Sequence, residues 1–90
     1  MKNNLQNNTP IEEKKLEWKI VQNVMKDKFG SDIFDSWLKK IELIDEYKNY
    51  VLISVSTRFI RDWITSRYLD QILQIVKSFK KDIIRIEFLV

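Results

Sequence analysis

The hydrophobic pattern of this 90-residue chain changes its period along the sequence, and these changes restrict the folds that it can adopt. Apolar residues recur at helical spacing up to about residue 39, alternate from Tyr50 to Ser56, return to helical spacing over 57–80 and alternate again over 82–90. A helix repeats its faces about every 3.6 residues and a strand about every 2, so each segment favours one backbone. The sequence predicts an α+β domain in the order α-α-β-β-α-β, with a three-stranded sheet packed by helices.

A first helix is expected from Thr9 to about Lys28. Thr9 can accept hydrogen bonds as the N-cap, Pro10 suits the first helical position, and Glu12 completes a capping box. Gly30, the only glycine of the chain, can end this helix with a backbone conformation that other residues avoid.

The ordered domain is expected to span 9–90 and to follow a disordered tail. Residues 1–8 are rich in asparagine and offer only Leu5 for burial, which is too little to order a segment. Ser31 can cap a second, short helix that ends near Lys39. The length suits one small domain, and the sequence contains no internal repeat.

Three strands are predicted, two of them joined in a hairpin. The hairpin joins a strand that begins near Ile41 to the run Tyr50–Ser56, and 82–90 forms the last strand. The residues expected to face the core are Val51, Ile53 and Val55 in the hairpin and Ile84, Ile86, Phe88 and Val90 in the last strand.

The composition excludes several kinds of chemistry. The chain has no cysteine and no histidine, which removes disulfides, cysteine-based zinc sites and the commonest general base. A single glycine excludes the glycine-rich loops that hold phosphates. The carboxylates of Asp32, Asp35, Asp45 and Glu46 fall at an expected helix start and turn, where capping and solvation explain them. No enzyme activity, metal or cofactor is therefore expected.

The sequence predicts a mildly basic, cytoplasmic protein. The formal net charge is +3 and the pI is about 9.2, with Lys and Arg spread along the chain. This balance permits weak contact with a nucleic acid backbone without requiring it. No apolar run reaches the roughly 18 residues of a membrane span. The N-terminus also lacks the apolar region of a signal peptide.

The chain has three tryptophans, more than a core of this size needs. Trp37 is expected in the core together with Phe34. Trp18 falls where the apolar stripe of its helix meets lysines. It therefore either packs its flank on the core or contacts a partner, because tryptophan has a large apolar body and one polar group.

A long helix, capped by Thr57, is predicted to run to about Lys80. Phe59 and Trp63 are four residues apart, so they share a face, and that face lies away from the core-facing stripe. Exposed apolar patches usually have a partner, which makes these two aromatics candidate binding residues. A helix kink, or burial of the first turn against the hairpin, is the alternative.

These aromatic residues and their neighbours resemble the N-terminal domain family of DnaA, the bacterial chromosomal replication initiator. The likeness extends from Trp18 to about Val90. Its marks are Trp18, the pair Phe34 and Trp37, the run Thr57–Trp63 (TRFIRDW) and the dipeptide Arg67-Tyr68. The resemblance implies a K-homology-like protein-docking domain that self-associates, recruits the replicative helicase DnaB, receives initiation regulators and contacts single-stranded DNA weakly.

The resemblance also implies roles for individual residues. Trp18 matches the self-association residue of the family. Phe59 matches its helicase- and regulator-binding phenylalanine, with Trp63 nearby. The acidic contact residue of the family aligns with Ile33 in this chain, so Asp32 is the nearest substitute.

Two other functions stay open at this point. A single-strand nucleic acid binder would use Arg58, Arg61 and Arg67 with Phe59 as a basic, stacking surface. The chain lacks the GxxG loop with which K-homology domains clamp a backbone. The other function is that of a structural adaptor unrelated to replication. The sequence is compatible both with an excised domain and with a stand-alone homologue.

Overall fold

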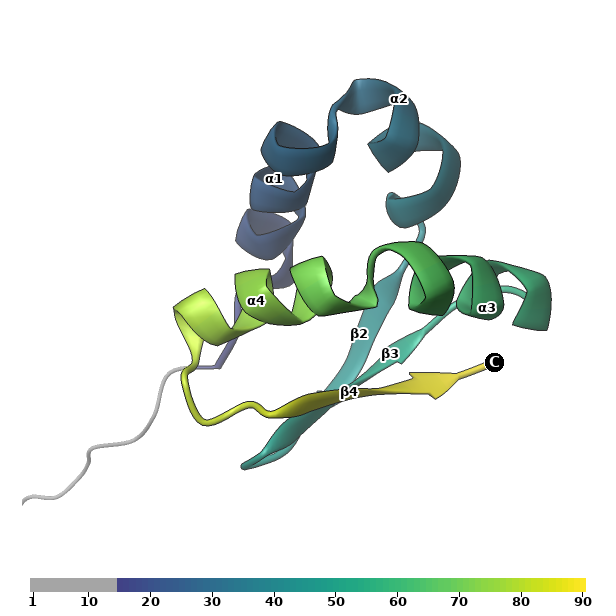
Figure 1. Ribbon diagram of the computed structural model, residues 1–90. Helices are drawn as coiled ribbons and strands as arrows, with labels where there is room; N and C mark the ends of the chain where they lie inside the picture. The colour runs from purple at the N-terminus through teal and green to yellow at the C-terminus, as the bar shows by residue number, and fades with distance from the viewer. Residues whose placement is uncertain (1–14) are drawn as a thin grey trace, which may run out of the picture.

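The computed structural model describes residues 15–90 and confirms the predicted α+β class (Figure 1). Its elements, in order, are α1 Trp18–Phe29, α2 Ser31–Ile33, the π-helix η1 Phe34–Leu38, β2 Glu42–Glu46, β3 Tyr50–Ser54, α3 Arg58–Arg67, α4 Leu69–Phe79 and β4 Arg85–Leu89. Among these residues, no helix is both long and apolar enough to cross a membrane.

The described strands form one three-stranded sheet in the order β2-β3-β4. β2 and β3 run antiparallel as a hairpin, whereas β3 and β4 run parallel. Parallel neighbours need a long crossover, and α3 and α4 supply it. Figure 1 shows the helices gathered on one face of the sheet, and no helix of residues 15–90 covers the other, open face. Val51 pairs with Ile86 and Ile53 pairs with Phe88 on the helix-covered face.

The core lies between the helices and this face of the sheet. Its members in the hairpin are the predicted residues Val51, Ile53 and Val55, all of which are buried. The other buried apolar residues are Val21, Met25, Phe34, Leu38, Ile41, Ile64, Ile72, Ile75, Val76 and Ile83. No polar or charged residue of the described part is fully buried, so hydrophobic burial dominates its stability.

Helix α1 begins later than the sequence predicts. The expected cap at Thr9 and the expected tail 1–8 lie outside the described residues. Residues 15–17 are described and are not helical, because the backbone N–H of Leu16 donates to Glu46 Oε1 at 2.8 Å. This bond to β2 holds the chain out of the helix until Trp18. The predicted end is confirmed, since Gly30 has a φ of 89° and its N–H donates to the Lys26 carbonyl.

The second helical segment continues from α2 into a π-helix. The N–H of Lys39 donates to the carbonyl of Phe34 at 2.8 Å, which is the five-residue spacing of a π-turn. Phe34 and Leu38 are buried, so the prediction for Phe34 is confirmed. Trp37 is only partly buried and packs against the core from its margin.

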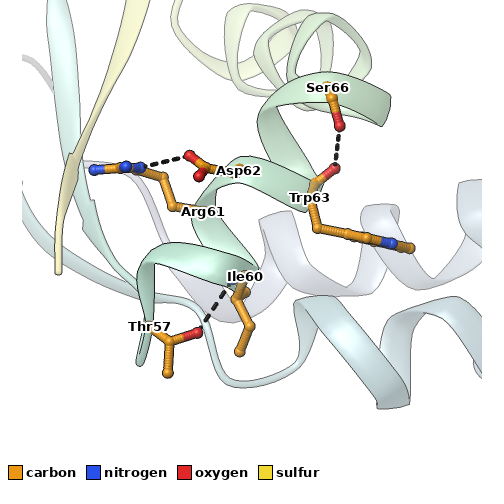
Figure 2. A network of polar contacts seen from close by, with 6 residues as sticks. All are labelled: Thr57, Ile60, Arg61, Asp62, Trp63 and Ser66. Atoms are coloured by element: carbon orange, nitrogen blue, oxygen red, sulfur yellow. Dashed lines mark hydrogen bonds and ion pairs between the residues drawn. The ribbon is translucent and has the colours of Figure 1, made fainter.

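The helix predicted over 57–80 is in fact two helices. Tyr68 interrupts it with φ −128° and ψ −3°, which is not a helical conformation. The predicted cap is confirmed, because the N–H of Ile60 donates to Thr57 Oγ1 at 3.1 Å (Figure 2). A single helical wheel over both segments therefore gives wrong positions for part of α3.

The last strand is shorter than predicted and begins at Arg85. Ile86 and Phe88 pack against the core, as predicted. Ile84 and Val90 are exposed, contrary to prediction, because both lie outside the regular strand. Ile83 is buried in place of Ile84.

The carboxylate of Glu46 ties three segments of the chain together. It accepts from Leu16 and forms an ion pair with Lys80 Nζ, while its side chain is only 6% exposed. Burial alone would raise the pKa of Glu46. The hydrogen bonds from Lys80 and from the Leu16 backbone, with the charges of Lys80 and Lys15, outweigh burial and hold this pKa below its ordinary value.

We expect Glu46 to make stability depend on acid pH. Because folding lowers the pKa of Glu46, its ionised carboxylate stabilises the native state at pH values above the ordinary glutamate pKa. This stabilisation is lost as the pH falls through the lower pKa of the folded state. Glu46→Gln should lower the free energy of unfolding at neutral pH by about 1–3 kcal/mol. It should also flatten the loss of stability below about pH 5, as measured by thermal melts.

The matched control is Glu42→Gln, because Glu42 lies exposed on the same strand. This variant should melt like the wild type at every pH. If Glu46→Gln and the wild type lose stability in parallel through the acid range, the carboxylate does not have the assigned effect.

Candidate protein-docking surface

Phe59 is the most exposed large hydrophobic side chain among residues 15–90, at 68%. It lies in the first turn of α3, immediately after the Thr57 cap. The cap fixes this turn, since Thr57 Oγ1 satisfies one of the backbone N–H groups that a helix start leaves without a partner. The fold therefore presents a large aromatic ring to solvent from an ordered helix start, as the sequence predicts.

A row of aromatic contacts runs from Phe59 along the margin of the core. The rings of Trp37 and Phe59 have centroids 6.1 Å apart, and those of Trp37 and Trp63 are stacked at 3.7 Å with an angle of 9°. Trp63 contacts Tyr68 at 5.1 Å, and Tyr68 contacts Phe29 edge-on at 5.0 Å. These five residues are called the aromatic row below. It connects η1, α3 and the end of α1.

Trp63 occupies a different position from the one predicted. The sequence placed it with Phe59 in an exposed patch, but it is partly buried and packs against the core. One cause is the break at Tyr68, and the other is η1, which brings Trp37 onto the Trp63 ring. Figure 2 shows the Trp63 ring extending away from Arg61 and Asp62. Of these two aromatics only Phe59 is largely exposed, and Trp63 is connected to it through Trp37.

A small cavity of about 170 Å³ lies between η1 and the start of α3. Its volume is comparable to that of one large side chain. Trp37 belongs both to this cavity and to the aromatic row. The other lining residues are the apolar Ile41, Val55 and Ile60 and the polar Asp35, Ser36, Lys40 and Ser56. An apolar side chain of a partner could enter here while another part of the partner contacts Phe59.

The three predicted arginines do not form one open basic surface. Arg61 Nε donates to Asp62 Oδ1 at 3.0 Å, so a carboxylate offsets its charge (Figure 2). The guanidinium of Arg67 lies 5.2 Å from the centre of the Trp63 ring, and Arg58 is exposed. Such an arrangement favours a mixed, aromatic surface over a continuous track for phosphates.

The remaining predicted residues lie elsewhere in the fold. Asp32 is exposed at the start of α2, whereas Ile33 packs against the core. Trp18 is partly buried, and its Nε1–H donates to the Ile41 carbonyl at 3.0 Å. It lines a shallow depression with Gln22, whose Nε2 donates to the Lys39 carbonyl at 3.1 Å. Trp18 therefore lies at the boundary of the core, with one edge of its ring near solvent.

We expect the Trp37–Trp63 stack to contribute measurably to stability. Trp37→Ala should lower the free energy of unfolding by about 2–4 kcal/mol, somewhat less than for a fully buried tryptophan. A double-mutant cycle with Trp63→Ala should give a coupling energy of about 0.5–1.5 kcal/mol. Denaturant titrations followed by circular dichroism would measure both quantities. Additive effects of the two substitutions would show that the rings do not stabilise each other.

The fold and this surface define a small α+β domain in which the exposed Phe59 ring lies at the end of a row of packed aromatic side chains. Residues 17–78 match the family described as the DnaA N-terminal domain, and the chain belongs to this family. This agrees with the resemblance seen in the sequence.

Similar proteins named chromosomal replication initiator protein DnaA occur in several bacteria. The chain is 38% identical to that of Wolbachia pipientis wMel over 66 residues, which is 73% of this chain and 14% of the relative. The figures for Rhizobium meliloti (strain 1021) are the same. For Ehrlichia ruminantium (strain Gardel) the identity is 42% over 57 residues, covering 63% of this chain and 12% of the relative. The chain thus spans only a small part of these relatives.

Proposed function

We propose that this chain is a protein-docking domain of bacterial replication initiation, with Phe59 as the central contact. The observation that carries the proposal is the 68% exposure of this ring on a fixed helix start. Support comes from the family, whose similar members are named chromosomal replication initiators. The partners proposed are the replicative helicase DnaB and initiation regulators, met in the bacterial cytoplasm.

The aromatic row makes Phe59 suitable as a binding hot spot. Binding costs free energy when side chains must be ordered at the interface, and pre-organised groups reduce this cost. Trp37 lies against Phe59, and the Trp63 stack in turn holds Trp37. Aromatic side chains in such settings supply much of the energy of many interfaces. We propose that Trp63 acts in docking through this support, and that exposed Asp32 adds a carboxylate contact from α2.

Phe59→Ala should separate binding from stability. The exposed ring contributes little to the core, so the free energy of unfolding should stay within about 1 kcal/mol of the wild type. Affinity for the purified helicase should fall by about 2 kcal/mol, or roughly 30-fold, the scale of a hot spot. Thermal melts and titration calorimetry would measure the two effects.

Salt dependence distinguishes docking from nucleic acid binding. Helicase binding through an apolar ring should change little between low and moderate salt, whereas contact with phosphates should weaken steeply. Phe79→Ala is the matched control, because Phe79 is an exposed phenylalanine at the end of α4. If Phe59→Ala binds the helicase like the wild type, Phe59 is not the central contact. Tight, strongly salt-dependent binding of single-stranded DNA would favour the alternative function.

We also propose that Trp18 takes part in weak self-association through α1. Its indole N–H already has an acceptor in the fold, so only its ring edge is offered to a second copy. A contact of this size is far smaller than a permanent interface and implies micromolar or weaker affinity. Trp18→Phe keeps the apolar flank and removes the outer ring. Sedimentation velocity should show weaker self-association for this variant than for the wild type, and equal association would exclude Trp18.

A further inference from the structure

The two edges of the sheet differ in how they are protected against pairing. In the described part of the chain, β2 and β4 each pair on one side only. The β2 edge is interrupted by a bulge between Leu43 and Asp45 and carries several acidic side chains. Bulges and charges are devices that keep edge strands from pairing with other chains. By contrast, β4 pairs with β3 in unbroken register along its whole length.

The backbone of β4 has hydrogen-bonding groups directed outward. The carbonyl of Leu89 accepts from the N–H of Val55 at 3.1 Å, so Leu89 directs its backbone groups toward β3. Successive residues of a strand direct these groups to opposite sides. Those of Ile86 and Phe88 consequently point away from β3 toward the free edge, which Figure 1 shows in yellow beside the C terminus. Such a row is a template for another strand.

Apolar side chains flank this edge and are exposed in the single chain. Ile84 is 59% exposed, and Leu89 and Val90 are also exposed. Burying them would be favourable, since apolar surface removed from water stabilises an association.

We propose that β4 pairs with β4 of a second copy of the chain, antiparallel and centred on Ile86. In this register Arg85 lies opposite Glu87 of the second copy, and the reverse pair also forms. Arg85 and Glu87 lie on the open face of the sheet, half exposed, with Nε and Oε2 2.7 Å apart in the single chain. Their charges would form a group of four on the joined sheet.

The alternative register, centred on Glu87, would place two glutamates opposite each other. Directly opposed like charges are destabilising in a sheet, whereas opposed unlike charges are stabilising. Charge thus selects the register centred on Ile86 for pairing with a second copy.

The pairing is short, so the association should be weak. Interfaces well below about 1,200 Å² belong to transient complexes. The surface involves neither Phe59 nor Trp18, so the inference stands or fails independently of the proposed function.

Charge reversal provides a direct test. Arg85→Glu alone gives chains with two acidic residues at 85 and 87, and Glu87→Arg alone gives chains with two basic ones. Each variant should associate at least about tenfold more weakly than the wild type in sedimentation velocity up to several hundred micromolar. An equimolar mixture should regain wild-type association, because each chain then opposes unlike charges. The contact between 85 and 87 within each chain is unchanged by mixing, so recovery reports only on pairing between chains.

A second variant tests the same register without changing the charges. The chain has no cysteine, so Ile86→Cys introduces a single thiol. Residues that oppose each other in an antiparallel pair have Cα atoms about 4.5–5.5 Å apart, within reach of a disulfide. Mild oxidation should give covalent dimers, whereas Ser78→Cys, on the exposed surface of α4, should not.

The inference is overturned if the wild type stays monomeric, if the single charge variants associate like the wild type, or if their mixture fails to recover. Association that persists in these variants and disappears in Trp18→Phe would assign the dimer to α1 alone. Phe59→Ala should leave the dimer intact, and Arg85→Glu should leave helicase affinity intact.

Discussion

The stack of Trp37 on Trp63 is the contact on which the surface around Phe59 depends. Their rings lie 3.7 Å apart and nearly parallel, and they join η1 to α3 across the helical layer. Without this contact, α3 would be held mainly by Ile64 and the neighbouring core residues. The start of α3 would then have fewer contacts near Phe59. A series of partly buried rings thus links the exposed Phe59 side chain to the packing of the domain.

Local patterns predicted the elements of this fold well, and contacts between elements account for the errors. The alternation of Val51, Ile53 and Val55 and the cap at Thr57 depend on nearby residues, and both were predicted correctly. The start of α1 depends on a bond from Leu16 to a distant carboxylate, which no local pattern contains. The break at Tyr68 likewise has no local signal, because no glycine or proline lies there.

The candidate surface was predictable only in part, for the same reason. The exposure of Phe59 follows from its place on a helical wheel, since its own turn is regular. The support of Trp63 by Trp37 brings together residues from separate helices, and the π-turn that presents Trp37 has no signature in the sequence. Phe29 and Tyr68 complete the row through another contact between helices. Single-sequence reasoning could therefore find the exposed ring of Phe59 but not the residues that pack beside it.

The parallel pairing of β3 with β4 has a consequence for where this domain ends. The family match covers residues 17–78, but β4 begins at Arg85. A strand is held in its sheet by main-chain hydrogen bonds, which do not depend on the identity of its side chains. Sequence similarity can therefore be lost over a strand that the fold still retains. A fragment cut at residue 78 would contain the whole matched region and still leave β3 unpaired along one side. The limits of sequence homology and the limits of the cooperative folding unit are therefore different in this molecule.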